Sequence, residues 1–84
     1  MKYLVTTLDG YSLEVETFFL NAESLTEIVD YIQQNINEDY HILVNENLQT
    51  VYGEIECDNR HMITTSWIFV NPVDRVEEYT ALCL

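Results

Sequence analysis

The side chains most often used as nucleophiles and bases are scarce in this chain. It has two histidines (His41 and His61), two cysteines (Cys57 and Cys83) and one lysine, Lys2. Nucleophilic catalysis requires a nucleophile held against a base that a third group orients. Both histidines lie at or inside apolar runs, and the two isolated glycines cannot form a glycine-rich phosphate loop. We therefore expect no catalytic residues and no enzymatic activity.

The same residues give one lead towards a metal site. Cys57 and His61 flank a predicted hairpin and could face one side of it, and Cys83 and His41 could complete a zinc site if the fold brought them together. Zinc sites usually show two closely spaced ligand pairs, and this chain has one. A small cysteine beside a histidine at the rim is the simpler interpretation, so we expect no metal and no cofactor.

Charge is the most unusual property of the sequence. Fifteen Asp and Glu residues face three Lys and Arg residues, which gives a formal net charge of −12 at pH 7. Such a surface disfavours direct binding to nucleic acid or to an anionic membrane, because both require basic patches. With 48% hydrophobic residues in 84, the chain is expected to fold as one domain over residues 1–84. The sequence has no signal peptide or apolar membrane-spanning run, which favours a cytoplasmic location.

The N-terminal part predicts a hairpin. Asp9-Gly10 is a strong signal for a two-residue turn between the alternating runs 3–8 and 11–20. With that turn, Leu4 lies opposite Val15 on the inner face, and Tyr3 and Val5 lie on the outer face.

A helix follows the first hairpin. Apolar residues recur at the spacing of one helical face at Leu25, Ile28, Val29, Ile32 and Ile36. Residues 24 and 27, a serine and a glutamate, match a capping box, with the asparagine at 21 as the alternative cap.

Three more strands are expected after the helix. Residues 40–44 form a short strand, and residues 51–57 and 61–70 form a second hairpin. A loop over residues 58–60 pairs Ile55 with Ile63 and is preferred to a turn at residues 58–59, which pairs Ile55 with Met62. Asn71-Pro72 ends the last strand, and the tail over residues 73–84 is interpreted as a strand, with a short helix as the alternative.

These elements predict an α+β fold. The order is ββαβββ, with a mainly antiparallel sheet of about five strands and one amphipathic helix packed on one face. The other face is then open to solvent or to a partner, and Tyr3, Tyr52 and Met62 are expected on it. The aromatic residues Phe18, Phe19, Trp67 and Phe69 are expected in the core, with a homo-oligomeric interface as their alternative role.

The acidic residues are grouped along the predicted elements. Two strands each carry two glutamates that are two residues apart, and alternation places each pair on the polar side of its strand. Few basic residues separate these groups, whereas an ordinary surface mixes the two signs. The expected partner-binding residues are Glu14, Glu16, Tyr52, Glu54, Glu56 and Asp58, and the alternative acidic patch on the helix is Glu23, Glu27 and Asp30.

In length, charge and compactness the chain resembles small phage-encoded inhibitors of host defence, including anti-CRISPR proteins and DNA mimics. The resemblance covers the whole composition and no particular motif. It implies a non-enzymatic inhibitor that occupies the basic surface of a nucleic-acid-binding or nucleic-acid-cleaving protein, in the host cytoplasm if a phage encodes it. Two other functions are consistent with the sequence: an immunity protein that neutralises a cognate nuclease toxin, and a structural module that forms a homodimer or larger oligomer.

Overall fold

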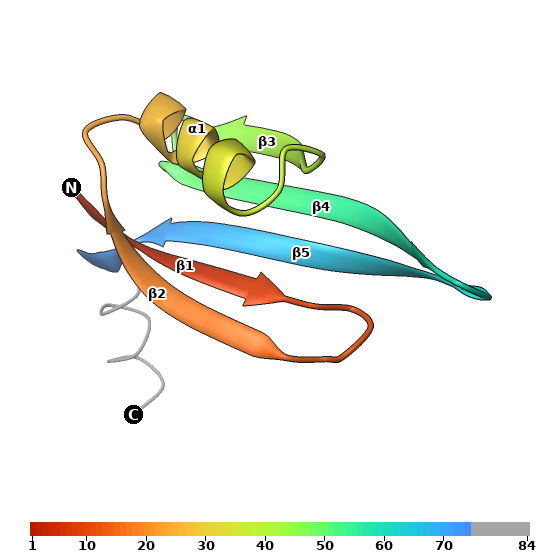
Figure 1. The fold of residues 1–84 in the computed structure, drawn as a ribbon. Helices are drawn as coiled ribbons and strands as arrows, with labels where there is room; N and C mark the ends of the chain where they lie inside the picture. Colours follow the sequence, from red (N-terminus) through yellow and green to blue (C-terminus); the bar gives the residue numbers. More distant parts are fainter. Residues whose placement is uncertain (75–84) are drawn as a thin grey trace.

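The computed structural model describes residues 1–74, with Asn59 described in its backbone alone, and has the predicted α+β fold (Figure 1). The order ββαβββ is confirmed. All strands join one antiparallel sheet of five strands, in the order β2-β1-β5-β4-β3. The elements are β1 (Lys2–Leu8), β2 (Val15–Asn21), α1 (Leu25–Asn35), β3 (His41–Asn45), β4 (Thr50–Asn59) and β5 (Met62–Pro72).

The helix α1 begins with the predicted capping box. The Ser24 hydroxyl accepts a hydrogen bond from the backbone N–H of Glu27 at 3.3 Å. The Glu27 carboxylate accepts one from the backbone N–H of Glu23 at 3.1 Å, one residue earlier than the usual partner. At the other end, the N–H of Ile36 bonds to the carbonyl of Ile32 at 2.9 Å and closes the last turn. Asn21, the alternative cap, belongs to β2.

The core lies between α1 and one face of the sheet. Ile28 and Ile32 of the helix are fully buried against the sheet, where Val5 and Ile68 are fully buried too. This corrects the predicted faces of the first hairpin, because Tyr3 and Val5 point into the core and not to the outer face. The buried apolar residues are Tyr3, Val5, Ala22, Leu25, Ile28, Ile32, Val51, Ile68 and Val70.

The connection between β1 and β2 is longer than the predicted two-residue turn. It spans residues 9–14, and Leu4 lies opposite Phe19 where Val15 was expected. The Asp9 carboxylate accepts hydrogen bonds from the N–H groups of Tyr11 at 2.8 Å and Ser12 at 3.2 Å, and its carbonyl accepts one from Leu13. Asp9 therefore organises a wider loop, in which Leu13 has the positive φ, 62°, that was expected of the glycine.

The second hairpin turns later in the chain than either prediction, residues 58–59 or residues 58–60, placed it. Its turn is Arg60-His61, with Arg60 at a φ of 57°, and Ile55 pairs with Ser66. Both predicted registers are therefore wrong. The observed register places Val51 opposite Val70, and both are buried in the core. Burial of this pair decides the pairing, while Ile63, the partner expected for Ile55, is 70% exposed.

Beyond the helix, β4 and β5 continue as a two-stranded arm, the β4–β5 arm, formed by residues 55–66 (Figure 1). β5 ends at Pro72, in agreement with the sequence. Residues 75–84 lie outside the described part, so the predicted final strand and the relation between Cys57 and Cys83 stay untested. No helix within residues 1–74 has the length and apolar character needed to cross a membrane.

Candidate protein-binding face

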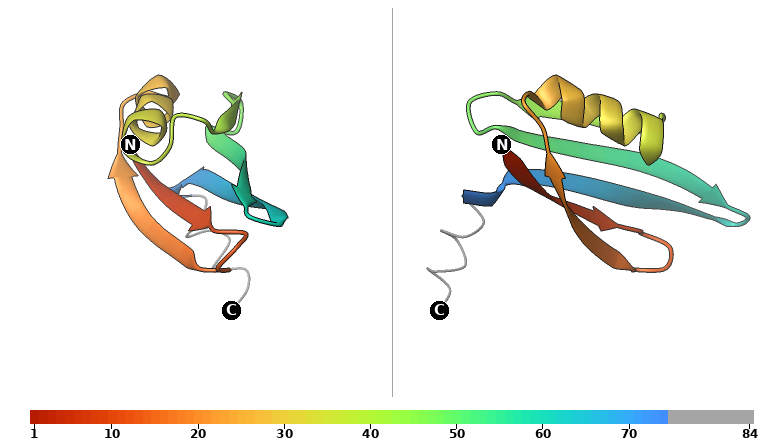
Figure 2. Two further views of the ribbon diagram at one scale, coloured as in Figure 1. Left: turned by 45° about the vertical axis from the view of Figure 1, so that its right-hand side comes forward. Right: turned by 60° about the vertical axis from the view of Figure 1, so that its left-hand side comes forward.

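One face of the sheet packs under α1, and no described element covers the opposite face (Figure 2). We call this second surface the open face. Strand alternation and the observed pairing decide which side chains it carries. They are Lys2, Leu4, Thr6 and Leu8 of β1, Val15, Thr17, Phe19 and Asn21 of β2, His41, Leu43 and Asn45 of β3, Thr50, Tyr52, Glu54, Glu56 and Asp58 of β4, and Ile63, Thr65, Trp67, Phe69 and Asn71 of β5.

A line of three carboxylates runs along β4 on the open face. Glu54, Glu56 and Asp58 alternate with Ile55 and Cys57, and all three acids are exposed. Neighbours in this line are separated by about 6.6 Å along the strand. We call this line the acidic row. It begins at Glu54, in the part of β4 next to the arm, and continues with Glu56 and Asp58 along the β4–β5 arm. The expected alignment of these residues on one side of their strand is thus present.

Tyr52 stands at the inner end of the acidic row. Its hydroxyl donates a hydrogen bond of 2.9 Å to Oε2 of Glu54. This bond to the carboxylate is the main cause of a raised pKa of the Tyr52 phenol, while the Trp67 side chain acts in the opposite direction. The Tyr52 ring also lies 5.4 Å from the Phe69 ring at an angle of 51°, a tilted arrangement that aromatic pairs favour. The row therefore ends against an aromatic pair.

Other side chains beside the acidic row were not predicted as part of the site. Glu54 lies directly between two cross-strand neighbours, Trp67 on β5 and His41 on β3. Trp67 is half-buried and Phe69 is 38% exposed, so their expected place in the core is wrong. The alternation of β5 held the necessary signal, because Ser66, Ile68 and Val70 form the buried series and leave both aromatic residues on the other face.

Two further expectations about the aromatic residues need correction. Tyr3 is 2% exposed in the core, and Met62, at the tip of the arm, belongs to the same helix-side series as Ser66, so neither lies on the open face. Phe19 is 60% exposed on the open face, where the Lys2 ammonium lies 4.9 Å from the centre of its ring. Of the four aromatic residues expected in the core, Phe18 alone packs against it.

The predicted pair Glu14 and Glu16 does not join the acidic row. Glu14 lies in the β1–β2 loop, and Glu16 lies opposite Thr7 on the helix side of β2. β1 and β5 also separate β2 from β4. Glu16 and the acidic row therefore lie on opposite faces of the sheet, and one flat surface cannot contact both.

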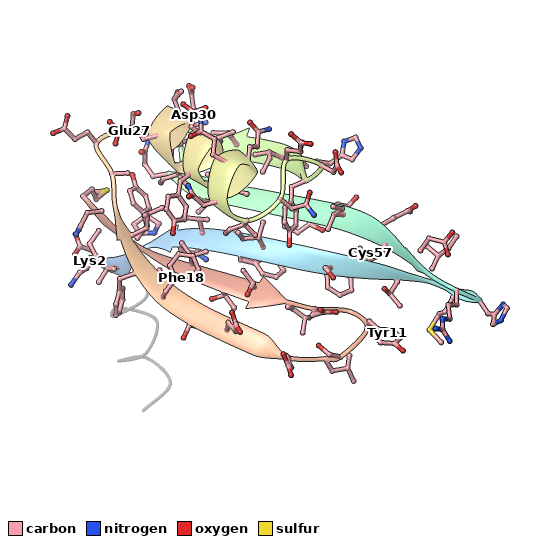
Figure 3. The ribbon with its side chains drawn as sticks, viewed as in Figure 1. Lys2, Tyr11, Phe18, Glu27, Asp30 and Cys57 are labelled. Atoms are coloured by element: carbon pink, nitrogen blue, oxygen red, sulfur yellow. The ribbon has the colours of Figure 1, made fainter. Side chains whose placement is uncertain are left out.

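The alternative patch on the helix is a third, separate surface. Glu27 and Asp30 project from α1 away from the sheet (Figure 3). Glu23, Glu27 and Asp30 are all exposed, but the Glu27 carboxylate is engaged in the capping box. Tyr31, which is 37% exposed, is the one aromatic residue of α1.

The residues of the metal lead are not brought together. His41 lies on the open face of β3, and Cys57 lies on the helix side of β4. His61 lies in the turn of the arm. Within residues 1–74, no three His, Cys, Asp or Glu side chains are grouped in a way that could hold a metal ion. Cys83, the fourth residue of this lead, lies outside the described part.

Comparisons of this chain with protein-family models, with curated proteins and with solved structures give no match. The geometry of the open face and the charge of the chain are therefore the features that bear on its function.

Proposed function

We propose that the chain is a non-enzymatic binding protein whose open face docks on a basic, arginine-rich surface of another protein. The observation that supports this most is the position of the acidic row beside Tyr52, Phe69 and Trp67. In a protein that binds nucleic acid, a surface of that kind is the nucleic-acid site itself. A chain docked there blocks the site without any reaction. This would make it an inhibitor of the anti-CRISPR or DNA-mimic class.

The two components of the open face have different energetic roles. An exposed ion pair contributes only about 0.2–1 kcal/mol, so three exposed carboxylates cannot hold a partner alone. Their combined field instead orients an approaching basic protein and speeds association. Aromatic side chains commonly supply the larger contact energies in interfaces, and a guanidinium stacks on their faces. Carboxylates next to aromatic rings therefore favour arginine over lysine in the partner.

The spacing of the carboxylates in the acidic row can be compared with the spacing of phosphates in DNA. Neighbouring carboxylates are about 6.6 Å apart, whereas each DNA strand carries one phosphate per about 3.4 Å of helix axis. The row is thus sparser than a DNA strand and carries no second, parallel row of acids on the described part of the open face. We infer that the chain competes for a few arginines at the centre of a nucleic-acid site and does not copy the outline of a duplex.

An arginine-rich peptide provides a defined test. We expect it to bind the chain more tightly than a lysine-rich peptide of equal length and charge, with an affinity that falls as salt increases. Fluorescence anisotropy of the labelled peptides measures both effects. Equal affinity for the two peptides would contradict the assigned role of the aromatic residues.

Charge reversal then assigns the binding to a surface. Glu54→Lys/Glu56→Lys should strongly weaken arginine-peptide binding, while the control Glu38→Lys/Glu46→Lys, with the same net charge and exposed positions, should retain most of it. A third variant, Glu23→Lys/Asp30→Lys, tests the helix patch and leaves the capping carboxylate of Glu27 in place. Equal losses in all three variants would mean that only net charge matters, and the open face would not be the site.

The same variants identify a natural partner. The partner should be retained from lysate by the original chain and by the control, lost by Glu54→Lys/Glu56→Lys, and released from its nucleic acid by the chain. A co-encoded nuclease that meets these conditions would indicate the immunity-protein function, which differs only in the partner.

A homo-oligomeric module is the second candidate, and the exposed apolar residues of β2 favour it. β2 is an edge strand, and Val15 and Phe19 are each 60% exposed. Against self-association, two copies each carry a formal net charge of −12 and repel one another. Sedimentation at low and high salt separates the candidates. A dimer that persists at low salt and is lost in Phe19→Lys would support the module, and a monomer throughout would exclude it.

A further inference from the structure

A small cavity lies on the helix side of the sheet, on the opposite face from the acidic row. It has a volume of about 260 Å³ and is formed where the end of α1, the β1–β2 loop and β5 meet. Pockets for drug-sized ligands usually measure about 300–1,000 Å³, so this cavity suits one side chain or a small molecule. Its lining includes Phe18, Ile36, Tyr40 and the three acids Asp9, Glu14 and Glu16.

Part of the wall of this helix-end cavity is apolar. Phe18 comes from β2, and Ile36 comes from the end of the helix. Phe18 packs against the core and its ring is 6.3 Å from that of Tyr31, so one wall is fixed by the helix. Such walls suit an aliphatic stem, whose burial contributes roughly 0.8 kcal/mol for each methylene group.

The cavity also has a negative potential from two independent sources. The first is the carboxylates of Asp9, Glu14 and Glu16, which belong to its lining. The second is the C-terminal end of α1, where both the Ile36 and Asn37 N–H groups bond to the Ile32 carbonyl and no basic residue occupies the last turn. The final carbonyls of the helix carry partial negative charge at this end. Cations are therefore favoured here by fixed backbone dipoles as well as by side chains.

Tyr40 is a further residue of the cavity. Its side chain lines the cavity, and burial is the main cause of a raised pKa of its phenol, with the charges of Cys57 and Asp9 adding to the effect. Ser66, which is 9% exposed, also lines the cavity, and its hydroxyl accepts a hydrogen bond from the N–H of Gly10 at 3.2 Å. The floor of the cavity is thus held to the β1–β2 loop that supplies two of its acids.

We infer that the helix-end cavity binds a guanidinium or ammonium group carried on an alkyl stem, with the stem against the apolar walls and the charged head among the three carboxylates. Two sources share this chemistry, an arginine or lysine side chain of a protein and a free polyamine. The site is separate from the open face, and it does not depend on the function proposed for that face.

Simple probes test this inference. n-Butylguanidinium carries the cation on a short stem, and n-butylurea has the same shape without the charge. Titration of each into the ¹⁵N-labelled chain, followed by NMR, should give saturable shifts of the Gly10, Phe18 and Ile36 amides with the guanidinium alone. Equal shifts with n-butylurea would mean that the cavity selects shape and not charge. Shifts spread over all acidic surfaces would mean that the cation only screens the protein. Either result would overturn the inference.

Variants locate the binding. Glu14→Gln/Glu16→Gln should weaken n-butylguanidinium binding by about fivefold or more, because two exposed charge pairs are lost. The control Glu38→Gln/Glu46→Gln removes equal charge elsewhere and should change it less than twofold. Equal weakening in both variants would contradict a site at the cavity. The shifts of the Gly10, Phe18 and Ile36 amides with n-butylguanidinium should be retained in Glu54→Lys/Glu56→Lys, which separates this test from that of the open face.

The two sources are distinguished with spermidine and N-acetyl-arginine methylamide. Tighter binding of spermidine at the cavity amides would indicate a free polyamine, and tighter binding of the arginine derivative would indicate a protein side chain. Failure of both to shift these amides would overturn the inference.

Discussion

The hydroxyl of Tyr52 donates a hydrogen bond to the Glu54 carboxylate two residues further along the same strand. Both side chains stand on the open face, so the phenol orients the first acid of the acidic row. The bond also links the row to the Phe69 ring, against which Tyr52 packs. Acidic and aromatic parts of the open face are therefore one connected group, and this connection can be measured by titration.

The first prediction concerns the pKa of Tyr52. It lies above the usual value because the phenol proton is held by Glu54, so it should fall towards 10 in Glu54→Gln. NMR titration of ¹³C-labelled tyrosine checks this, with Glu56→Gln as the control that leaves the hydrogen bond intact. An unchanged pKa in Glu54→Gln would mean that the hydrogen bond does not exist in solution.

The same shift has a defined effect on stability. The folded pKa of Tyr52 is raised above the unfolded value, so its stabilising contribution is fully present below the unfolded pKa, near 10, and is lost as pH rises through the folded pKa. Urea unfolding at increasing alkaline pH should therefore show a shallower loss of stability in Tyr52→Phe than in the original chain. The difference should be small, because Tyr52 is only partly buried and its bond to Glu54 lies at the surface.

The second prediction concerns Gly10. A Cβ atom at this position would lie 1.8 Å from the carbonyl oxygen of Thr65, so the β1–β2 loop and β5 would have to separate. Gly10→Ala should lower the free energy of unfolding by about 1–3 kcal/mol, measured by urea denaturation. The φ of Gly10 is not positive, so backbone strain is not the cause.

Gly53→Ala is the matched comparison. A Cβ atom at Gly53 would lie 2.6 Å from the Cγ2 of Ile68 and 3.2 Å from a ring carbon of Tyr40, which are side-chain atoms that can move more readily than a backbone carbonyl. We expect Gly53→Ala to cost less than Gly10→Ala. The reverse order would indicate that the β1–β2 loop gives way easily.

The sequence predicted elements more successfully than it predicted their pairing. The helix was correctly bounded by the periodic apolar residues and by Ser24, because these signals are local. The two hairpins were misread because their turns depend on contacts far along the chain. Gly10 is needed for close approach to Thr65, and nothing near Asp9-Gly10 indicates that contact. Arg60 takes the positive φ in the second turn although its residue type does not favour it.

The candidate site was predicted in part, because some of its residues are related by local pattern and others by long-range strand pairing. Glu54, Glu56 and Asp58 share one strand, so simple alternation placed them together. Their relation to Glu14 and Glu16 depends on strand order and on which face packs under α1, and neither follows from local pattern. The strand order β2-β1-β5-β4-β3 inserts β5, the last of the described strands, between the first hairpin and β4. That long-range pairing also brings Trp67 beside Glu54.

The third prediction tests the capping box. Ser24→Ala removes the acceptor for the Glu27 N–H and should lower the free energy of unfolding by about 1 kcal/mol. Thr26→Ala, an exposed change in the first turn of α1, is the control and should be neutral or slightly stabilising because alanine has the higher helix propensity. Thermal unfolding followed by circular dichroism checks both. Equal effects of the two changes would mean that the hydroxyl of Ser24 contributes nothing as a cap.

The last prediction separates the two halves of the open face. Phe69 packs against Tyr52 beside the acidic row, whereas Phe19 lies on the edge strand β2. If the face binds arginine-rich surfaces as proposed, Phe69→Thr should weaken arginine-peptide binding by about tenfold or more, which corresponds to loss of about 1.4 kcal/mol or more of interface contact. Phe19→Thr should leave it within about twofold. Threonine is chosen because it retains a high strand propensity, so both variants should keep the sheet.

Urea unfolding of the two variants provides the control for folding, and the stability change should be modest in each because both rings are partly or largely exposed. Loss of affinity in Phe19→Thr without loss in Phe69→Thr would move the binding surface to the β2 edge. That result would favour the homo-oligomeric module, because β2 is the strand whose apolar side chains are exposed without acidic neighbours on the open face.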